Sequence, residues 1–335
     1  MIHTINDIST ESGLSVATIS RYLNGKTIRE RNKKTVEEAI LKLDYIVNKN
    51  ARGLRLSESR MIGLLFPKLD DIFSSIMISI TQRLLDEKNY TVILATSGLG
   101  AKEKNAVDFL VAHRVEGIIA IPIYPSLNSY ESAKKRKIPI VFYDVDMAEN
   151  GSDSIVADNF NIGRLSANTF AEKAHKKVAI ICGTEDAYTA KQRKEGFLKG
   201  LEDNNIALNN EYIVENASDA EYGGYIGTKK LLAMQEPPTA IFASNYYFTI
   251  GMITALNEMK LIPGKDISVI GVDNLSLTKI IRPKLTMVTQ PYEKIAAAAV
   301  DLLIKRIGEK DGYYNSRRIT LEASIETGES VADLR

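Results

Sequence analysis

After Met61 the sequence alternates between short apolar runs and longer amphipathic stretches, and this alternation limits the folds open to the chain. The apolar runs predict strands at Ile62–Phe66, Thr91–Ala95, Gly117–Ile121, Ile138–Tyr143, Lys177–Ile181, Tyr212–Val214, Ala240–Ala243 and Ser268–Val272. The stretches between them predict helices at Ile76–Glu87, Ala101–His113, Arg164–Ala174, Thr189–Asp203, Tyr222–Met234, Thr249–Met259 and Pro291–Ile307. Strands that alternate with helices in this way form parallel sheets, because each helix makes a right-handed crossover between two parallel strands. We therefore expect an α/β body built as one large sheet, a barrel or two smaller lobes, and the irregular spacing disfavours the barrel.

The first 45 residues have the pattern of short helices. Thr4 followed by Asp7 predicts a capping arrangement at the start of a first helix, and Gly13 is expected to end it. Ser15 is the expected N-cap of a second helix, and a charged third helix is expected over about 30–43. Residues 48–59 are polar, basic and poor in apolar side chains, which indicates a linker.

Charge is distributed unevenly along the chain. The whole protein carries 43 Lys and Arg against 42 Asp and Glu, a net charge of +1. Residues 1–60 alone carry 11 basic and 7 acidic residues, a net +4, so the remaining 275 residues carry a net −3. A basic module on a mildly acidic body indicates an anionic partner for the N-terminal part only, and chance is the alternative because a net +4 over sixty residues is modest.

The cysteine count and the apolar pattern bear on where the protein works. One cysteine, Cys182, cannot form a disulfide within the chain, which favours a reducing compartment. The N-terminal residues show no basic segment followed by an apolar one, and no apolar run reaches the roughly 18 residues of a membrane span. We therefore expect a cytoplasmic protein with no membrane partner.

Residues 7–23 have the spacing of a helix-turn-helix, in which the second helix projects into the major groove of DNA. The exposed face of that helix would carry Val16, Ala17, Ser20 and Arg21. Small side chains allow a close approach to base edges, and arginine can reach guanine or phosphate. An ordinary helical hairpin has the same spacing, so both interpretations stay open on this pattern alone.

The residues themselves are more specific. The chain has Thr4-Ile5-Asn6-Asp7-Ile8 and then Gly13-Leu14-Ser15-Val16-Ala17-Thr18-Ile19-Ser20-Arg21-Tyr22-Leu23-Asn24. Further along it has Ala51-Arg52-Gly53-Leu54, Arg193-Lys194-Glu195-Gly196-Phe197 and Gly271-Val272-Asp273-Asn274. These segments closely resemble the lactose/galactose-repressor (LacI/GalR) family of bacterial transcription regulators, and the resemblance spans nearly the whole chain.

The resemblance implies a domain organisation and a DNA-contacting surface. It implies an all-α helix-turn-helix headpiece over residues 1–46, a hinge helix or linker over 47–59, and an effector-binding and dimerisation domain over 60–335. That domain would be a periplasmic-binding-protein-like (type I) pair of lobes, the N-lobe about 60–158 plus 289–318 and the C-lobe about 159–288 plus 319–335. The implied DNA-binding residues are Thr4, Ser15, Val16, Ala17, Thr18, Ser20, Arg21, Asn24, Asn48, Ala51 and Leu54, with Leu54 as an apolar wedge in the minor groove.

Candidate effector-binding residues lie near the carboxyl ends of predicted strands, where ligands of open α/β sheets bind. Asp144, Asn245 and Asp273 each follow a strand, and Arg193 lies on the helix after Lys177–Ile181. Phe73, in the first loop, could stack on a ligand. Carboxylates, an amide and a guanidinium suit vicinal hydroxyls or a purine edge, although each could instead be a cap or a surface ion pair.

We therefore expect a homodimeric DNA-binding regulator that represses a carbohydrate-utilisation operon, with a sugar or sugar phosphate bound between the lobes. Control by a purine or by a phosphorylated carrier protein is the alternative, and a sugar-binding protein without DNA function is a further one. We expect no cofactor, metal site or catalytic residue. An enzyme is disfavoured because His3, His113 and His175 are scattered, Cys182 has no partner motif, and no glycine-rich phosphate loop follows a strand.

Overall fold

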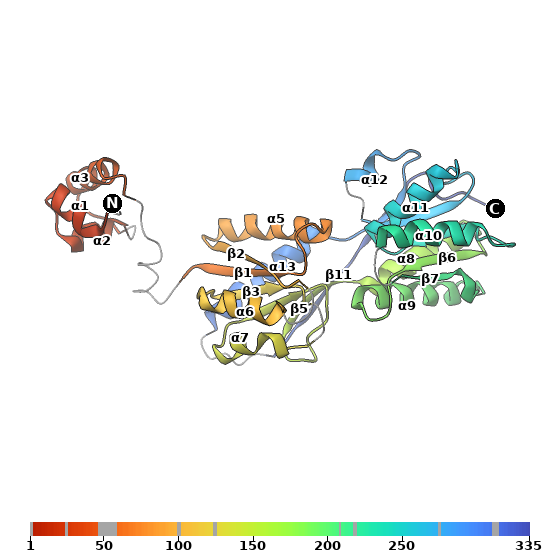
Figure 1. Ribbon diagram of the computed structural model, residues 1–335, viewed down its shortest axis with the longest axis horizontal. Helices are drawn as coiled ribbons and strands as arrows, with labels where there is room; N and C mark the ends of the chain where they lie inside the picture. The colour runs from red at the N-terminus through yellow and green to blue at the C-terminus, as the bar shows by residue number, and fades with distance from the viewer. Residues whose placement is uncertain are drawn as a thin grey trace. The chain divides into compact units, whose positions relative to one another are not determined.

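The computed structural model describes residues 3–23, 26–45, 59–98, 102–122, 126–207, 209–216, 220–273, 276–309 and 315–335. The chain divides into two compact units, Met1–Ser59 and Arg60–Arg335, and Figure 1 labels many of their elements. Of the expected hinge over 47–59, only Ser59 lies within the described residues.

The described residues of the first unit form three helices: α1 (Ile5–Ser12), α2 (Val16–Leu23) and α3 (Glu30–Lys42). The Asp7 carboxylate accepts hydrogen bonds from the Thr4 backbone N–H (2.6 Å) and the Thr4 hydroxyl (2.9 Å), which confirms the predicted capping arrangement. Gly13 ends α1 with a φ of +66°, in the left-handed region that glycine adopts without strain. Ser15 caps α2, because its Oγ accepts the Thr18 backbone N–H at 3.3 Å.

A small apolar core joins these three helices. Ile8 from α1, Ile19 from α2, and Val36 and Ala39 from α3 are buried together. Around this core the Tyr22 hydroxyl donates to the Glu37 carboxylate at 2.7 Å, which ties α2 to α3. The core thus fixes the turn between α1 and α2.

The described residues of the second unit form two six-stranded sheets, so this unit is two-lobed (Figure 1). The first sheet has the order β11-β5-β4-β3-β1-β2, and its strands are β1 (Met61–Phe66), β2 (Thr91–Thr96), β3 (Gly117–Ala120), β4 (Ile140–Tyr143), β5 (Asp153–Ala157) and β11 (Arg318–Leu321). The second has the order β12-β10-β9-β8-β6-β7, and its strands are β6 (Val178–Cys182), β7 (Ile213–Glu215), β8 (Ala240–Ala243), β9 (Ser268–Val272), β10 (Thr286–Thr289) and β12 (Ser324–Glu326). Neighbouring strands are parallel except β10 and β12. This confirms the α/β class and the two-lobed arrangement.

Helices accompany each sheet. The first lobe contains α5 (Ile72–Glu87), α6 (Lys102–Ala112), α7 (Glu131–Lys135) and α13 (Tyr292–Gly308), with a 3-10 turn at Asn128–Tyr130. The second lobe contains α8 (Asn159–Glu172), α9 (Tyr188–Asp203), α10 (Ala220–Leu232), α11 (Tyr246–Glu258) and α12 (Ser276–Ile280), with a 3-10 turn at Asn210–Tyr212. Within the described part of the chain, none of the helices has the length and apolar character that a bilayer crossing requires.

The chain passes between the lobes three times: from β5 to α8, from β10 to α13, and from β11 to β12. The last passage falls between Leu321 and Ser324, a few residues beyond the boundary near 318 that we expected. Because the carboxyl ends of parallel strands in both lobes lead into these passages, polar side chains from both lobes can meet there.

Candidate functional site

The exposed face of α2 has the composition expected of a helix that enters a DNA groove. Ala17 and Arg21 are exposed and Val16 and Ser20 are half-buried, whereas Ile19 on the opposite side is fully buried. Side chains three and four residues apart are neighbours on a helix surface. Val16 and Ser20, Ala17 and Ser20, and Ala17 and Arg21 have this spacing, so the four side chains form one continuous surface. It presents small side chains with one long cation at the edge, which suits contact with base edges and phosphates.

Hydroxyl side chains lie at the starts of the first two helices. Thr4 and Ser15 are exposed, and Ser15 Oγ and Thr18 Oγ1 lie 2.9 Å apart. Hydroxyls and backbone N–H groups at helix N-termini are common phosphate contacts in DNA complexes. Four further predicted residues lie outside the described part of the chain, and they are Asn24, Asn48, Ala51 and Leu54.

A set of exposed cations on the first unit was not among our predicted site residues. It runs from the residues before α3 into its first turns and consists of Lys26, Arg29, Arg31, Lys33 and Lys34. Exposed cations of this density neutralise phosphates and release counterions, which gives affinity without sequence preference. The signal was present in the sequence as the net charge of the N-terminal module, but it did not identify individual residues.

In the second unit, three of the predicted residues come together between the lobes. Asp144 follows β4 in the first lobe, while Asp273 follows β9 and Arg193 lies on α9 in the second. Both carboxylates lie close enough to Arg193 for its charge to lower their pKa. Asp144 and Asp273 have φ angles of +62° and +69°. Residues other than glycine adopt this left-handed backbone conformation only at a cost in free energy. Strain of this kind often marks a binding site.

The position of Arg193 follows from the packing of α8 against α9. A Cβ at Gly163 on α8 would lie 2.0 Å from the Arg193 carbonyl oxygen, and a Cβ at Gly196 would lie 1.8 Å from the Phe160 carbonyl oxygen. Only glycine at these two positions allows so close an approach of the helices. Arg193 is 5% exposed, and its Nε donates to Asn159 Oδ1 at 2.8 Å.

A second hydrogen bond orients the same guanidinium. Arg193 Nη1 donates to the Ser244 carbonyl oxygen at 2.8 Å. Asn159 at the start of α8 and Ser244 after β8 therefore set the direction of the guanidinium, and neither was predicted. Their part in the site depends on contacts between segments far apart in the chain.

Asp273 is held by residues from the passage into α13. Gln290 Nε2 donates to both carboxylate oxygens of Asp273, at 3.2 and 3.1 Å. Burial raises the pKa of Asp273, while Arg193, the Tyr292 hydroxyl and Gln290 act in the opposite direction. Burial and the Asp273 charge raise the pKa of Tyr292 well above its usual range. The Tyr292 ring lies 5.7 Å from that of Phe73, so the predicted aromatic residue also belongs to this cluster.

Asp144 has the most strongly perturbed acidity of the predicted carboxylates. Its side chain keeps some exposure, yet loss of solvation raises its pKa from 3.8 to about 7. Arg193 lowers this pKa, and the charges of Asp273 and Asp71 raise it. The site thus holds three carboxylates near one guanidinium, so acceptors for hydrogen bonds exceed donors.

Asn245 has a structural part in this region. It is the N-cap of α11, and its Oδ1 accepts the Phe248 backbone N–H at 2.8 Å. Asp71 and Asp158 cap α5 and α8 in the same way, accepting from Ser74 N–H at 2.8 Å and from Asn161 N–H at 2.9 Å. The positive ends of these helices help to offset the carboxylates.

Comparison with known proteins decides the family. Residues 4–48 match the bacterial regulatory proteins of the lacI family, and residues 167–331 match the periplasmic binding protein-like domain. The HTH-type transcriptional repressor PurR of Histophilus somni (strain 2336) is 30% identical over 310 residues, which cover 92% of this chain and 93% of that protein. The chain belongs to the lacI family. This LacI-family protein is a DNA-binding transcriptional regulator, and its family is one of regulators and not of enzymes.

Other similar proteins agree with this assignment. The PurR repressor of Actinobacillus pleuropneumoniae serotype 3 is 28% identical over 333 residues, 99% of each chain. The Lac repressor dimer bound to operator and the anti-inducer ONPF has a TM-score of 0.88 at 24% identity, covering 99% of this chain and 100% of that one. A complex of the regulator CelR with cellobiose has a TM-score of 0.74 at 20% identity, covering 98% and 99%. These two structures show that the LacI-family fold is shared.

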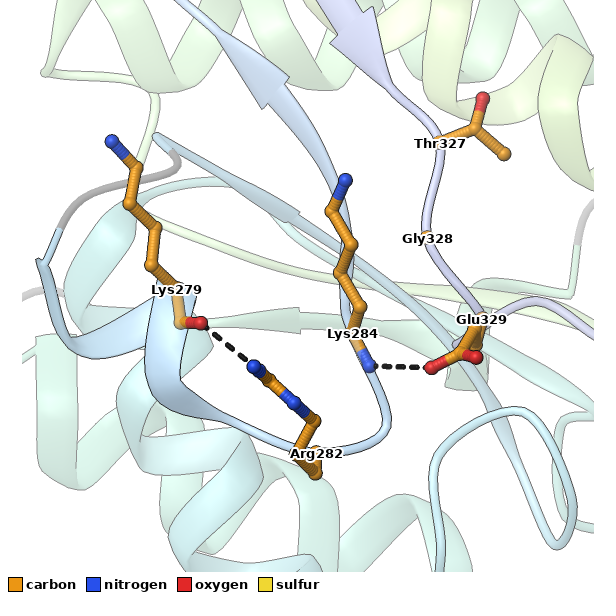
Figure 2. A pocket seen from close by; sticks show the side chains of 6 residues that line it. All are labelled: Lys279, Arg282, Lys284, Thr327, Gly328 and Glu329. Carbon is orange, nitrogen blue, oxygen red and sulfur yellow. Dashed lines mark hydrogen bonds between the residues drawn. The ribbon is translucent and has the colours of Figure 1, made fainter.

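A hollow of this LacI-family regulator lies on the surface of the second lobe, apart from the residues described above (Figure 2). Its lining is Lys279, Arg282, Lys284, Thr327, Gly328 and Glu329. Arg282 Nη1 donates to the Lys279 carbonyl oxygen at 3.0 Å, and the Lys284 backbone N–H donates to the Glu329 carboxylate at 3.1 Å. The second of these bonds holds the loop to the C-terminal segment. None of the six lining residues is buried, in contrast to the polar groups of the site between the lobes. Among the described residues, no cluster of His, Cys, Asp or Glu could hold a metal ion.

Proposed function

We propose that this regulator represses transcription in the cytoplasm by binding a pseudo-palindromic operator as a homodimer, and that a neutral sugar bound between the lobes changes its operator affinity. The observation that carries the effector part is the convergence of Asp273, Asp71 and the guanidinium of Arg193 on Asp144.

The DNA part rests on the first unit. The α2 face with Ala17 and Arg21 enters the major groove, and the exposed cations before and on α3 contact phosphates. One such unit reads one half-site, so an operator with two-fold symmetry requires two chains. The segment over 47–59, with Leu54 as a minor-groove wedge, joins each headpiece to its body.

The second unit offers an apolar surface that supports a dimer. Tyr222 and Ile226, one helical turn apart on α10, are 61% and 42% exposed. Large apolar side chains exposed next to each other on one helix face are typical of interfaces. We propose that a second copy of the chain covers this face.

The acidic residues of the site favour a neutral effector over an anionic one. Carboxylates accept hydrogen bonds from vicinal hydroxyls, and a neutral sugar supplies many such donors. A sugar phosphate would add a dianion where acidic groups already outnumber the cation, and this costs free energy. A purine is the second candidate, because the Phe73 and Tyr292 rings lie beside Asp273 and a base could stack there.

The test is a ligand panel followed by thermal stability and calorimetry on the full chain. The panel contains glucose, galactose, ribose and cellobiose, their available phosphates, and hypoxanthine and guanine. We expect one neutral sugar to raise the melting temperature of the wild type but not of Asp273→Asn. Asp86→Asn, at an exposed position on α5, is the matched control and should respond like the wild type. Stabilisation by a phosphate or a purine alone would refute the neutral-sugar proposal.

A further inference from the structure

Two helices from different lobes begin beside each other. In the first lobe α5 begins at Ile72, and in the second lobe α11 begins at Tyr246. Tyr247, the second residue of α11, connects them. Its hydroxyl oxygen accepts a hydrogen bond from the Ile72 backbone N–H at 3.0 Å.

This bond satisfies a group that the first lobe does not satisfy by itself. The first N–H groups of a helix have no acceptor within the helix. The Asp71 side chain serves the Ser74 N–H and hydroxyl, at 2.8 and 2.9 Å, while the Ile72 N–H is served from the other lobe. Tyr247 is half-buried and its ring meets that of Tyr246 edge-on at 5.5 Å, which orients the hydroxyl.

We infer that Tyr247 is a positioning residue that holds the two lobes together, in what we call the closed form. It thereby sets the fraction of ligand-free molecules that are closed before the effector binds. Both partners of the bond belong to the protein itself, one in each lobe, so the bond breaks when the lobes separate. A net hydrogen bond changes an equilibrium by about two- to tenfold, so its loss lowers the closed-to-open ratio by that factor.

The regulatory consequence rests on the proposed function. An effector that contacts both lobes binds the closed form, so its apparent affinity falls with the closed fraction. Loss of the bond therefore moves the ligand-free regulator in the direction opposite to the effector. If the sugar releases DNA, the variant binds DNA more tightly than the wild type does, and if the sugar promotes binding, the variant binds more weakly.

Two variants remove the same bond from opposite ends. Tyr247→Phe removes the acceptor and keeps the ring. Ile72→Pro removes the donor at the first helical position, which tolerates proline, and the preceding Asp71 has the extended backbone (φ −77°, ψ +131°) that proline requires. Because both act on one interaction, the double variant should resemble the single ones. Tyr212→Phe is the control, since its hydroxyl donates to the Glu236 carbonyl at 2.7 Å within the second lobe.

The direct readout is the distance between the lobes in ligand-free, full-length protein. Spin labels are attached at Lys134→Cys on α7 and Glu202→Cys on α9, both exposed positions, and labelled chains are diluted with unlabelled ones. Cys182 is buried and should not be labelled. We expect Tyr247→Phe and Ile72→Pro to shift the distances toward longer values, and Tyr212→Phe to match the wild type. If Ile72→Pro fails to fold, Tyr247→Phe alone decides.

Binding to DNA from upstream of its own gene, without sugar, is the second readout. An affinity shift opposite in sign to that caused by the active sugar supports the inference. Unchanged label distances in Tyr247→Phe, or an affinity shift of the same sign as the sugar's, would overturn it. If the wild type shows no specific DNA binding, the proposed function fails, and the label distances still decide the part of Tyr247.

Discussion

Replacing Asp144 by asparagine should stabilise the body of the protein while weakening effector binding. The Asp144 carboxylate has a pKa of about 7 in the folded protein and 3.8 as its ordinary value. A carboxyl group whose pKa is raised by folding binds its proton more tightly in the folded state. Ionisation of Asp144 therefore lowers the free energy of unfolding. This loss is absent below pH 3.8, grows as the pH rises, and reaches its maximum above pH 7.

The size of the effect follows from the pKa difference. One pKa unit corresponds to about 1.4 kcal/mol. Ionisation of Asp144 therefore lowers the free energy of unfolding by about 1 kcal/mol at pH 4.5 and by about 4 kcal/mol at pH 8. These values are upper bounds, because the side chain keeps some exposure and water screens its charge. The Asp144→Asn substitution would remove the cost at both values of pH. The stabilisation should therefore be small at pH 4.5 and large at pH 8.

The assay is thermal unfolding of wild type, Asp144→Asn and Asp86→Asn by calorimetry at the two values of pH. The transition of the body should rise by several degrees for Asp144→Asn at pH 8, and little at pH 4.5. Asp86→Asn should leave it unchanged at both. Equal stability of Asp144→Asn and wild type at pH 8, or a lower stability of the variant, would show that burial does not raise the pKa of Asp144 as described.

Four further changes should have separable effects. Ile19→Ala removes a fully buried side chain from a small core, so we expect a loss of about 2 to 4 kcal/mol, lost DNA binding in a mobility-shift assay, and an unchanged response of the body to sugar. Arg193→Lys keeps the charge but loses the two hydrogen bonds to Asn159 and the Ser244 carbonyl. Calorimetry should therefore show about 10- to 100-fold weaker effector binding, and an unchanged affinity would contradict this expectation. Arg21→Ala should lower the slope of log affinity against log salt by about 1 if the side chain contacts phosphate, whereas an unchanged slope with relaxed sequence preference would indicate a base contact. Leu54→Ala should weaken binding to operator and leave binding to random DNA largely intact, and equal losses on both would defeat the wedge assignment.

Much of the fold could be predicted from the apolar pattern, because fully buried strands such as Ile62–Phe66 are continuous apolar runs between turns. The strands missed were those without this signal. Asp153–Ala157 begins with a carboxylate that is buried because Arg306 Nε pairs with it at 2.7 Å, and Thr286–Thr289 begins and ends with threonine, so neither is a continuous apolar run. Arg318–Leu321 and Ser324–Glu326 were also missed, because both are short and mix polar with apolar residues. A buried ion pair between segments so far apart leaves no local pattern.

Three helices were predicted to begin several residues after their true first residue, because their first turns also lack a local apolar pattern. Helices expected at Ile76, Arg164 and Thr249 begin at Ile72, Asn159 and Tyr246. The first turns missed lie at the site, where the caps Asp71, Asp158 and Asn245 are polar and break the apolar spacing. Sequence reasoning therefore named Asp144, Arg193 and Asp273, but it could not name the side chains that orient them.

The central claim is that one chain reads a specific DNA sequence and responds to a neutral sugar. The most direct measurement is a titration of the purified full-length protein with DNA from upstream of its own gene, against random DNA of equal length at one physiological salt concentration. Salt is fixed because phosphate contacts alone can mimic affinity. We predict at least about 1000-fold tighter binding to the upstream DNA, changed by one neutral sugar of the panel. Equal binding to both DNAs, unaffected by any sugar, would contradict the account.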